Sequence, residues 1–127
     1  MSVPPDTFSF RCGVTTMVYA ESAGWRNFAC FEENAINRSR TRVLSFLNIV
    51  GRGMAGGGLE QDVAGMDPTA TAVTALKHPS IVGIKTAHYQ GRDWAAVEHS
   101  LQAGDRAGLP AMVDFGASHP EAPWNDC

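Results

Sequence analysis

Four short apolar segments, rich in residues that favour β-strands, recur along the chain. They are residues 13–20 (GVTTMVYA), 42–50 (RVLSFLNIV), 81–87 (IVGIKTA) and 109–115 (LPAMVDF). Each is a continuous apolar run without strict alternation, which is typical of strands buried on both faces in a parallel sheet. The pattern therefore predicts four buried, parallel strands.

The segments between these strands have helical spacing. Asp67 and Pro68 are typical of a helix start, because aspartate caps free backbone N–H groups and proline suits the first helical position. Pro79 should stop this helix, and Gly104 and Gly108 should loosen the end of the next one. The apolar stripes that we expect to face the sheet are Phe28, Phe31 and Ala35; Ala70, Val73 and Leu76; and Trp94, Val97 and Leu101.

The spacing of the strands predicts an α/β fold. They begin near residues 13, 42, 81 and 109, and strand–helix–strand units of about 30 residues or more give parallel strands with right-handed crossovers. Two architectures fit: an open doubly wound sheet, and four consecutive units of a (β/α)8 barrel, whose full length is about 250 residues. The pattern alone does not choose between them, and without further information we prefer the open sheet. In both, active sites form beyond the C-terminal ends of the strands.

Composition narrows the class of protein. The chain has 127 residues, 44% apolar and 18% charged, with a net charge of −3, so we expect one globular domain over residues 1–127. No cluster of Lys and Arg predicts nucleic-acid binding. No apolar run is long enough to span a bilayer, and the N-terminus lacks the features of a signal peptide. Cys12, Cys30 and Cys127 form no C-x-x-C pair, which favours reduced thiols in a cytoplasmic protein. Because no run spans a bilayer, we expect no membrane partner.

Lys85 is the most informative residue at a predicted strand end, because it follows four apolar or glycine positions without a polar break. An isolated buried ammonium is costly. The side chain can reach solvent, pair with a carboxylate, or lose its proton and become a nucleophile. A neutral lysine can react with carbon dioxide to form a carbamate, whose two oxygens can bridge two metal ions. The residues alone leave these three alternatives open.

Other polar residues mark the remaining strand ends. Asp114 could join Lys85 in binding a metal, since carboxylates suit zinc and manganese, or it could form a salt bridge with Lys85 without metal. Ser22, Asn48 and His88 are candidates for a substrate pocket; a helix cap is the structural alternative for Ser22, and a hydrogen-bonded structural role for His88. The glycine-rich residues 51–58 lack a phosphate-binding motif and predict either an active-site loop or a flexible connection.

Four blocks together, in this order, resemble the amidohydrolase superfamily: GVTTMVYAESAGWRNF, INRSRTRVLSFLNIVGRGM, IVGIKTAHYQG and AGLPAMVDFG. The nearest branch is the amidohydrolase/deacetylase metallohydrolases, relatives of dihydroorotases and D-aminoacylases. The resemblance implies a partial TIM barrel, strands 2 to 5, from a metal-dependent hydrolase of amide or cyclic amide C–N bonds. It implies one or two divalent ions, usually zinc, and a carboxylated lysine at Lys85, formed with carbon dioxide. It also places Asp114 where many members have a histidine ligand.

The chain departs from the family pattern in several places. The H-x-H pair of the first barrel strand, the histidine of the sixth and the aspartate of the eighth, the usual general base, have no counterpart. We therefore expect no catalytic residue here, weak metal binding and no activity for this fragment alone. Its sheet edges should be covered by the rest of the barrel or by a homo-oligomer.

Two further departures favour a different function. Tyr19 and Glu21 stand where relatives tend to have Asp and Gly, and Tyr19 puts the packing or the pocket of that strand in doubt. They favour the alternative of a non-catalytic α/β domain that binds a ligand or partner. An open-sheet nucleotide binder is a weaker alternative, because the glycine fingerprints are missing.

Overall fold

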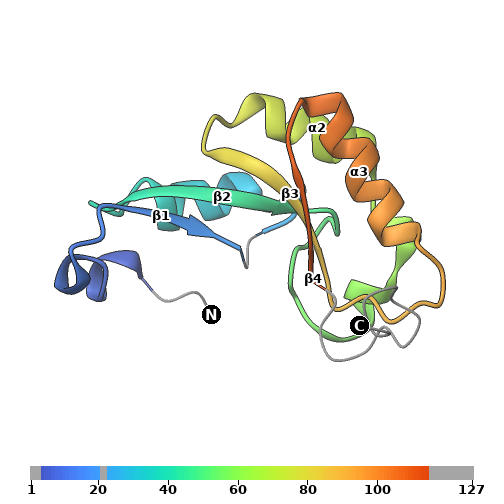
Figure 1. The fold of residues 1–127 in the computed structure, drawn as a ribbon, viewed down its shortest axis with the longest axis horizontal. Helices are drawn as coiled ribbons and strands as arrows, with labels where there is room; N and C mark the ends of the chain where they lie inside the picture. Colours follow the sequence, from blue (N-terminus) through green and yellow to red (C-terminus); the bar gives the residue numbers. More distant parts are fainter. Residues whose placement is uncertain (1–3, 21–22, 115–127) are drawn as a thin grey trace, which may run out of the picture.

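The computed structural model describes residues 4–20 and 23–114. Its centre is a strongly curled sheet of four parallel strands in the order β1-β2-β3-β4 (Figure 1). All four predicted strands are present, and three are shorter than predicted. The strands are β1 (Thr16–Tyr19), β2 (Arg42–Asn48), β3 (Ile81–Ala87) and β4 (Ala111–Asp114).

Helical segments follow the first three strands. The first is α1 (Phe28–Phe31), which continues as a π-helical turn over Glu32–Ile36; the others are α2 (Pro68–Lys77) and α3 (Ala95–Ala107). The side chain of Asp67 accepts hydrogen bonds from the backbone N–H groups of Thr69 and Ala70, which confirms the predicted start of α2. Gly108 ends α3 with a left-handed backbone, φ 67°. Short 3-10 turns lie at Pro5–Thr7, Phe10–Cys12, Gly57–Gln61 and Val63–Gly65.

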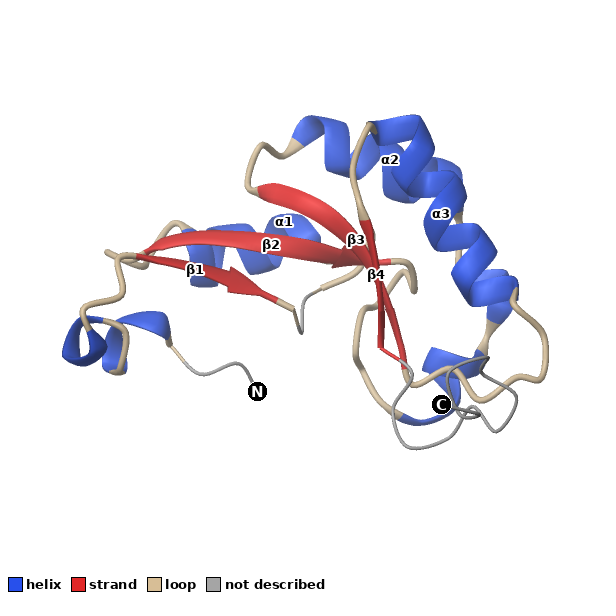
Figure 2. Cartoon of the chain, in the orientation of Figure 1, coloured by secondary structure: helices blue, strands red, loops and turns tan. Residues whose placement is uncertain are grey.

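The strand order distinguishes the two architectures that the sequence left open. A doubly wound sheet reverses its strand order at a switch point, whereas here each strand pairs with the next one along the chain. Right-handed crossovers in one direction place all helices on one face of the sheet. Accordingly α2 contacts β2 and β3, α3 contacts β3 and β4, and α2 and α3 lie side by side on the outside of the curl (Figure 2). This is the arrangement of a barrel segment.

The core lies between this outer face and the helices, and it corrects the predicted stripes. In the first stripe Phe28 is fully buried, and the partly buried Phe31 packs against the core together with Ile36 and not with Ala35. In α2 the buried residues are Thr71, Ala72 and Ala75, while Val73 and Leu76 are exposed. In α3 they are Ala96, Ser100, Ala103 and Gly104, while Trp94 and Leu101 are exposed. The strands and the segments next to them supply the bulky core residues, so α2 and α3 approach through small side chains. Leu47, Ile81 and Ile84 lie in strands, Ile49 and Val50 follow β2 directly, and Met66 precedes α2.

Gly104 also differs from its predicted role. A Cβ at this position would lie 2.6 Å from the carbonyl oxygen of Leu109. The backbone N–H of Leu109 donates to the carbonyl of Gly104 over 2.9 Å. The glycine therefore permits a close approach between α3 and the segment that leads into β4, and does not loosen the helix end.

Two findings bear on the predictions from composition. No helix within residues 4–20 and 23–114 is long and apolar enough to cross a membrane. Cys12 and Cys30 are exposed free thiols, and Cys127 lies outside the described residues.

Candidate metal-binding site at the strand ends

Lys85 lies near the C-terminal end of β3 and is 4% exposed, although its side chain ends in an amine. Its Nζ lies 3.5 Å from Oδ2 of Asp114, at the end of the neighbouring strand β4. The lysine side chain is 5% exposed and the aspartate side chain 43%. The structure thus brings together the two residues predicted as metal ligands, and it orients the lysine nitrogen toward a strand end and away from bulk water.

Asn48 forms the neighbouring wall of this site. It is opposite Lys85 in the parallel pairing of β2 with β3, so both side chains project from the same face of the sheet. Asn48 is 1% exposed, and its Oδ1 accepts a hydrogen bond from the backbone N–H of Val50 over 2.9 Å. The N–H of Ile49 donates to the carbonyl of Lys85 over 2.8 Å. Asn48 therefore shapes the turn that leaves β2 beside the lysine.

His88 is held at the edge of the site by the glycine-rich loop. Its Nδ1 lies 2.8 Å from Oε2 of Glu60, which is 5% exposed, and Oε1 of Glu60 accepts from the N–H of Gly56 over 2.8 Å. Nε2 of Gln61 donates to the carbonyl of His88 over 2.7 Å, and the N–H of Gln90 donates to Oε1 of Gln61 over 2.8 Å. We call Glu60, Gln61, His88 and Gln90 the loop clasp.

The loop clasp contains three residues that the sequence did not single out: Glu60, Gln61 and Gln90. Glu60 and Gln61 come just after residues 51–58, the segment that predicted an active-site loop or a flexible connection. The sequence feature that could have indicated them is an acid and an amide just after a glycine-rich loop, at the end of the sheet where active sites form. Their hydrogen bonds tie the loop after β2 to the segment after β3.

Tyr19 lies on the other side of the sheet from Lys85. Its ring makes an edge-to-face contact with Phe31 of α1, with centroids 5.5 Å apart. Tyr19 pairs with Ser45, three positions before Asn48, and an odd separation along a strand places side chains on opposite faces. The phenol therefore fills the layer under α1 and does not enter the site around Lys85. Glu21 and Ser22 lie outside the described residues.

A second phenol fixes the segment after β3. Burial raises the pKa of the Tyr89 hydroxyl above its ordinary value of 10.0, and the hydrogen bond to Asp93 adds to this effect. The neutral phenol donates to Oδ1 of Asp93 over 2.9 Å, and the same oxygen accepts from the N–H of Ala95 over 3.1 Å. These two hydrogen bonds connect the segment after β3 to the first turn of α3.

The described residues provide some, but not all, of the ligands that a metal site needs. Within residues 4–20 and 23–114, no three His, Cys, Asp or Glu side chains come together as a metal-binding group. Lys85 and Asp114 remain two adjacent candidate donors, one buried and one open to solvent. A structural zinc site usually has four ligands and a catalytic one three from the protein. A complete site would therefore need donors from outside these residues.

No protein-family model matches the sequence, and no curated protein matches it. Among solved structures, an adenine deaminase has a TM-score of 0.82 and 23% sequence identity, over 91% of this chain and 33% of that chain. A dihydroorotase has a TM-score of 0.69 and 28% identity, over 82% of this chain and 30% of that one. Both are members of the amidohydrolase superfamily, which confirms the resemblance seen in the sequence.

The chain spans about a third of the length of these two structures. Their barrels extend the same succession of strands that this chain forms, so its four parallel strands are a curled half-barrel. The predicted fold class, a partial (β/α)8 barrel, is confirmed.

Proposed function

We propose that this chain carries part of the metal site of a hydrolase that cleaves amide or cyclic amide C–N bonds in small molecules. Lys85, as a carbamate, and Asp114 would hold divalent metal, zinc in one or two ions. The carbamate forms when the neutral lysine nitrogen bonds to the carbon of carbon dioxide and a proton leaves. The observation that carries the proposal is the buried Nζ of Lys85, 3.5 Å from Asp114 at the functional end of the sheet.

When bound, such a metal supplies polarisation of a carbonyl and activation of water. The residues of this chain would shape the surroundings. Asn48, buried beside Lys85, forms one wall of the site. The loop clasp holds His88 at the edge of the site, where the side chain of His88 is 47% exposed. Ser22, outside the described residues, is the third residue that we propose for the substrate pocket. The general base would come from another part of the barrel.

A non-catalytic α/β domain that binds a ligand or partner is the second candidate. The pair of Lys85 and Asp114 supports it, because the carboxylate compensates the buried ammonium without any metal. The two candidates differ in one measurable property, which is whether metal binding depends on Lys85.

The flanking DNA provides the first test. The hydrolase proposal expects a preceding frame with an H-x-H strand and a following frame with strand-end histidine and aspartate. The chain would then be produced together with these products, and zinc and amide hydrolysis measured. Lys85→Ala should lose zinc, and a carbon-13 carbamate signal grown from labelled bicarbonate should disappear with it.

Lys77 offers a matched control, because it is the other lysine of the chain and lies exposed in the last turn of α2. Lys77→Ala should keep zinc and the carbamate signal. Equal zinc content in the two variants would reject the metal-site proposal in favour of the binding domain. Metal-dependent amide turnover by the purified 127-residue chain would instead contradict the inference that its site is incomplete.

A further inference from the structure

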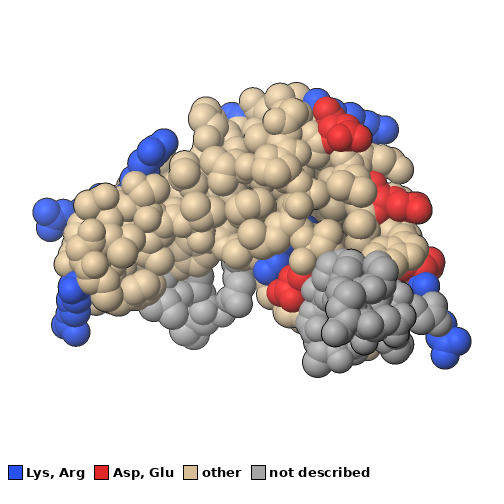
Figure 3. All heavy atoms as spheres, in the orientation of Figure 1, with Lys and Arg blue, Asp and Glu red and all other residues tan. Residues whose placement is uncertain are grey.

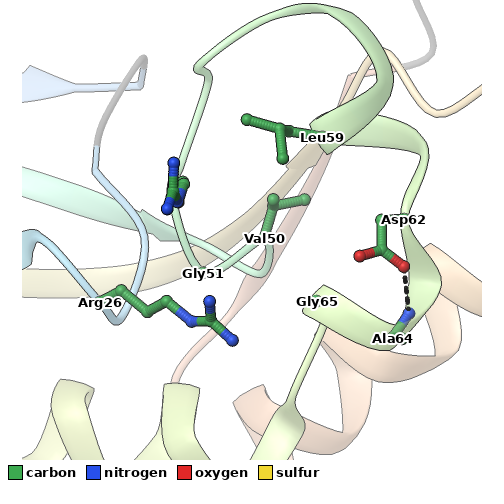
Figure 4. A pocket seen from close by; sticks show the side chains of 8 residues that line it. Arg26, Val50, Gly51, Leu59, Asp62, Ala64 and Gly65 are labelled. Carbon is green, nitrogen blue, oxygen red and sulfur yellow. Dashed lines mark hydrogen bonds between the residues drawn. The ribbon is translucent and has the colours of Figure 1, made fainter.

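A cavity of about 260 Å³ lies beyond the end of β2, apart from the lysine–aspartate pair. Figure 4 shows Arg26 reaching into the space between Gly51 and Gly65, with Asp62 on the opposite wall and Leu59 above. Arg52 also lines it. The volume suits a ligand smaller than a typical drug-sized molecule.

The walls of this cavity are fixed by backbone hydrogen bonds. The N–H of Arg26 donates to the carbonyl of Gly51 over 2.8 Å, and the N–H of Gly51 donates to the carbonyl of Gly65 over 3.0 Å. A Cβ at Gly51 would lie 3.1 Å from Nε of Arg26 and 2.9 Å from Cε2 of Trp25. Glycine at this position therefore lets the arginine and the indole lie directly against the wall.

The charges in the cavity favour an anion. Among the described residues, no carboxylate lies within ion-pair distance of Arg26 or Arg52. Oδ1 of Asp62 is engaged with the N–H of Ala64 over 3.0 Å. Two guanidinium groups and one carboxylate leave the lining with one net positive charge, and such a site attracts a singly charged anion.

Arg26 is partly ordered before any ligand binds. Its guanidinium carbon lies 4.6 Å from the centre of the Trp25 ring, a cation–π contact that limits its rotamers. A side chain already held in place loses less entropy on binding. Nε1 of Trp25 is buried without a hydrogen-bond partner among the described residues, and the ring atom bonded to it is the one nearest Gly51. This N–H lies buried behind Gly51 and does not line the cavity.

We propose that this cavity binds the carboxylate group of a small molecule, with Arg26 and Arg52 as its ligands. The planar fork of a guanidinium matches a carboxylate in a bidentate arrangement. A phosphate dianion shares the oxyanion chemistry, but Asp62 repels its second charge. The site is independent of metal and of the hydrolytic function proposed above.

The test is a titration of the 127-residue chain, followed by NMR, with sodium acetate and in parallel with inorganic phosphate at matched ionic strength. Acetate should shift the amide signals of Gly51 and Gly65 and the indole signal of Trp25 with saturation. Arg26→Gln with Arg52→Gln should weaken binding about tenfold or more, since each removes a charge-assisted hydrogen bond. Arg11→Gln with Arg92→Gln, two exposed arginines away from the cavity, is the matched control and should leave binding unchanged.

Asp62→Asn is a second variant that keeps the oxygen bonded to Ala64 and removes the negative charge. It should tighten acetate binding severalfold. Shifts that do not saturate, or that are equal in both arginine pairs, would overturn the site. Tighter binding of phosphate than of acetate would overturn the carboxylate assignment, and loss of acetate binding in EDTA would assign it to a metal.

Discussion

His88 combines a strained backbone with two hydrogen bonds to the loop after β2. Its φ is 59°, in the left-handed region that costs a residue with a Cβ about 1–2 kcal/mol. Glu60 bonds its ring and Gln61 its carbonyl. The hydrogen bonds of the loop clasp therefore hold His88 in a conformation that favours glycine.

Comparing two substitutions at His88 separates strain from contact. His88→Ala and His88→Gly both remove the bond to Glu60, and a hydrogen bond to a charged group contributes about 1.5–3 kcal/mol. Glycine also relieves the strain, offset by about 0.5–1 kcal/mol of its own chain entropy. We expect urea unfolding to show both variants destabilised, with Gly more stable than Ala by about 0.5–1 kcal/mol. A more stable Ala variant would mean that the φ of His88 is not held in solution.

Asp6 makes the stability of the N-terminal segment depend on pH. The N–H of Arg40 donates to its Oδ2 over 2.9 Å, and Thr41 donates to Oδ1 through its N–H over 2.9 Å and its hydroxyl over 2.7 Å. These bonds, the one from Arg40 first, lower the pKa of Asp6 below its ordinary value of 3.8. A lowered folded pKa means that the contribution is complete above about pH 4 and is lost as the pH falls through the folded value.

Thermal unfolding across pH tests this link. Asp6→Ala should lower the melting temperature at pH 7, and the difference from the unmodified chain should shrink below about pH 4. Asp105→Ala, on the exposed side of α3, is the control and should show no such convergence. A difference that stays constant down to the acid limit would contradict the role of the ionised carboxylate.

The helices of this chain approach the sheet through small residues, and Gly104 is the tightest point of α3. Gly104→Ala gains about 1 kcal/mol of helix propensity. It also places a methyl group 2.6 Å from the carbonyl oxygen of Leu109, a backbone atom that cannot turn aside. Overpacking of this kind costs about 1–3 kcal/mol, so we expect net destabilisation in chemical unfolding. Gly58→Ala, with open space around the new methyl group, should be close to neutral.

The strands and helices were predictable from the sequence because the spacing of apolar residues and the residues that begin or end an element are local signals. Continuous apolar runs located the four strands, and Asp67 with Pro68 located the start of α2. The buried faces of α2 and α3 were not predictable in this way. Hydrophobicity favoured Val73 and Leu101, whereas packing against bulky strand residues selected Ala75 and Gly104, a choice that depends on the partner surface.

The candidate site was predictable only in part for the same reason. Lys85 and Asp114 stand at strand ends, and parallel pairing of adjacent strands brings such residues together. The loop clasp depends on hydrogen bonds between two loops far apart in sequence, Glu60 and Gln61 with His88 and Gln90, and no periodicity reports these. The role of Tyr19 likewise required knowing that α1 lies on its side of the sheet.

At the scale of the whole molecule, the inner face of the half-barrel is exposed at its two edge strands, β1 and β4, whereas Asn48 and Lys85 between them are buried. Val18 is 48% exposed and Met112, opposite Lys85 in the sheet, is 37% exposed. Val18 pairs with Leu44, which shares the face of Asn48 by alternation along β2. On the face seen in Figure 3, residues other than Lys, Arg, Asp and Glu make up most of the described surface. An apolar sheet face with unpaired edges is a site of association between protein chains.

We therefore expect the chain to self-associate through this face at concentrations on the order of 100 µM, measurable by sedimentation velocity. Val18→Lys with Met112→Lys should shift the distribution toward monomer. Val73→Lys with Leu76→Lys makes the same change on the outer face of α2, and in each case the net charge becomes −3 + 2 = −1. Because the charge is matched, only location distinguishes the pairs. An equal shift in both would assign association to general charge, and a larger shift in the α2 pair would assign it to the helical face. Association that depends on Val18 and Met112 would mean that a second copy of the chain covers the inner face, which further strands enclose in a complete barrel.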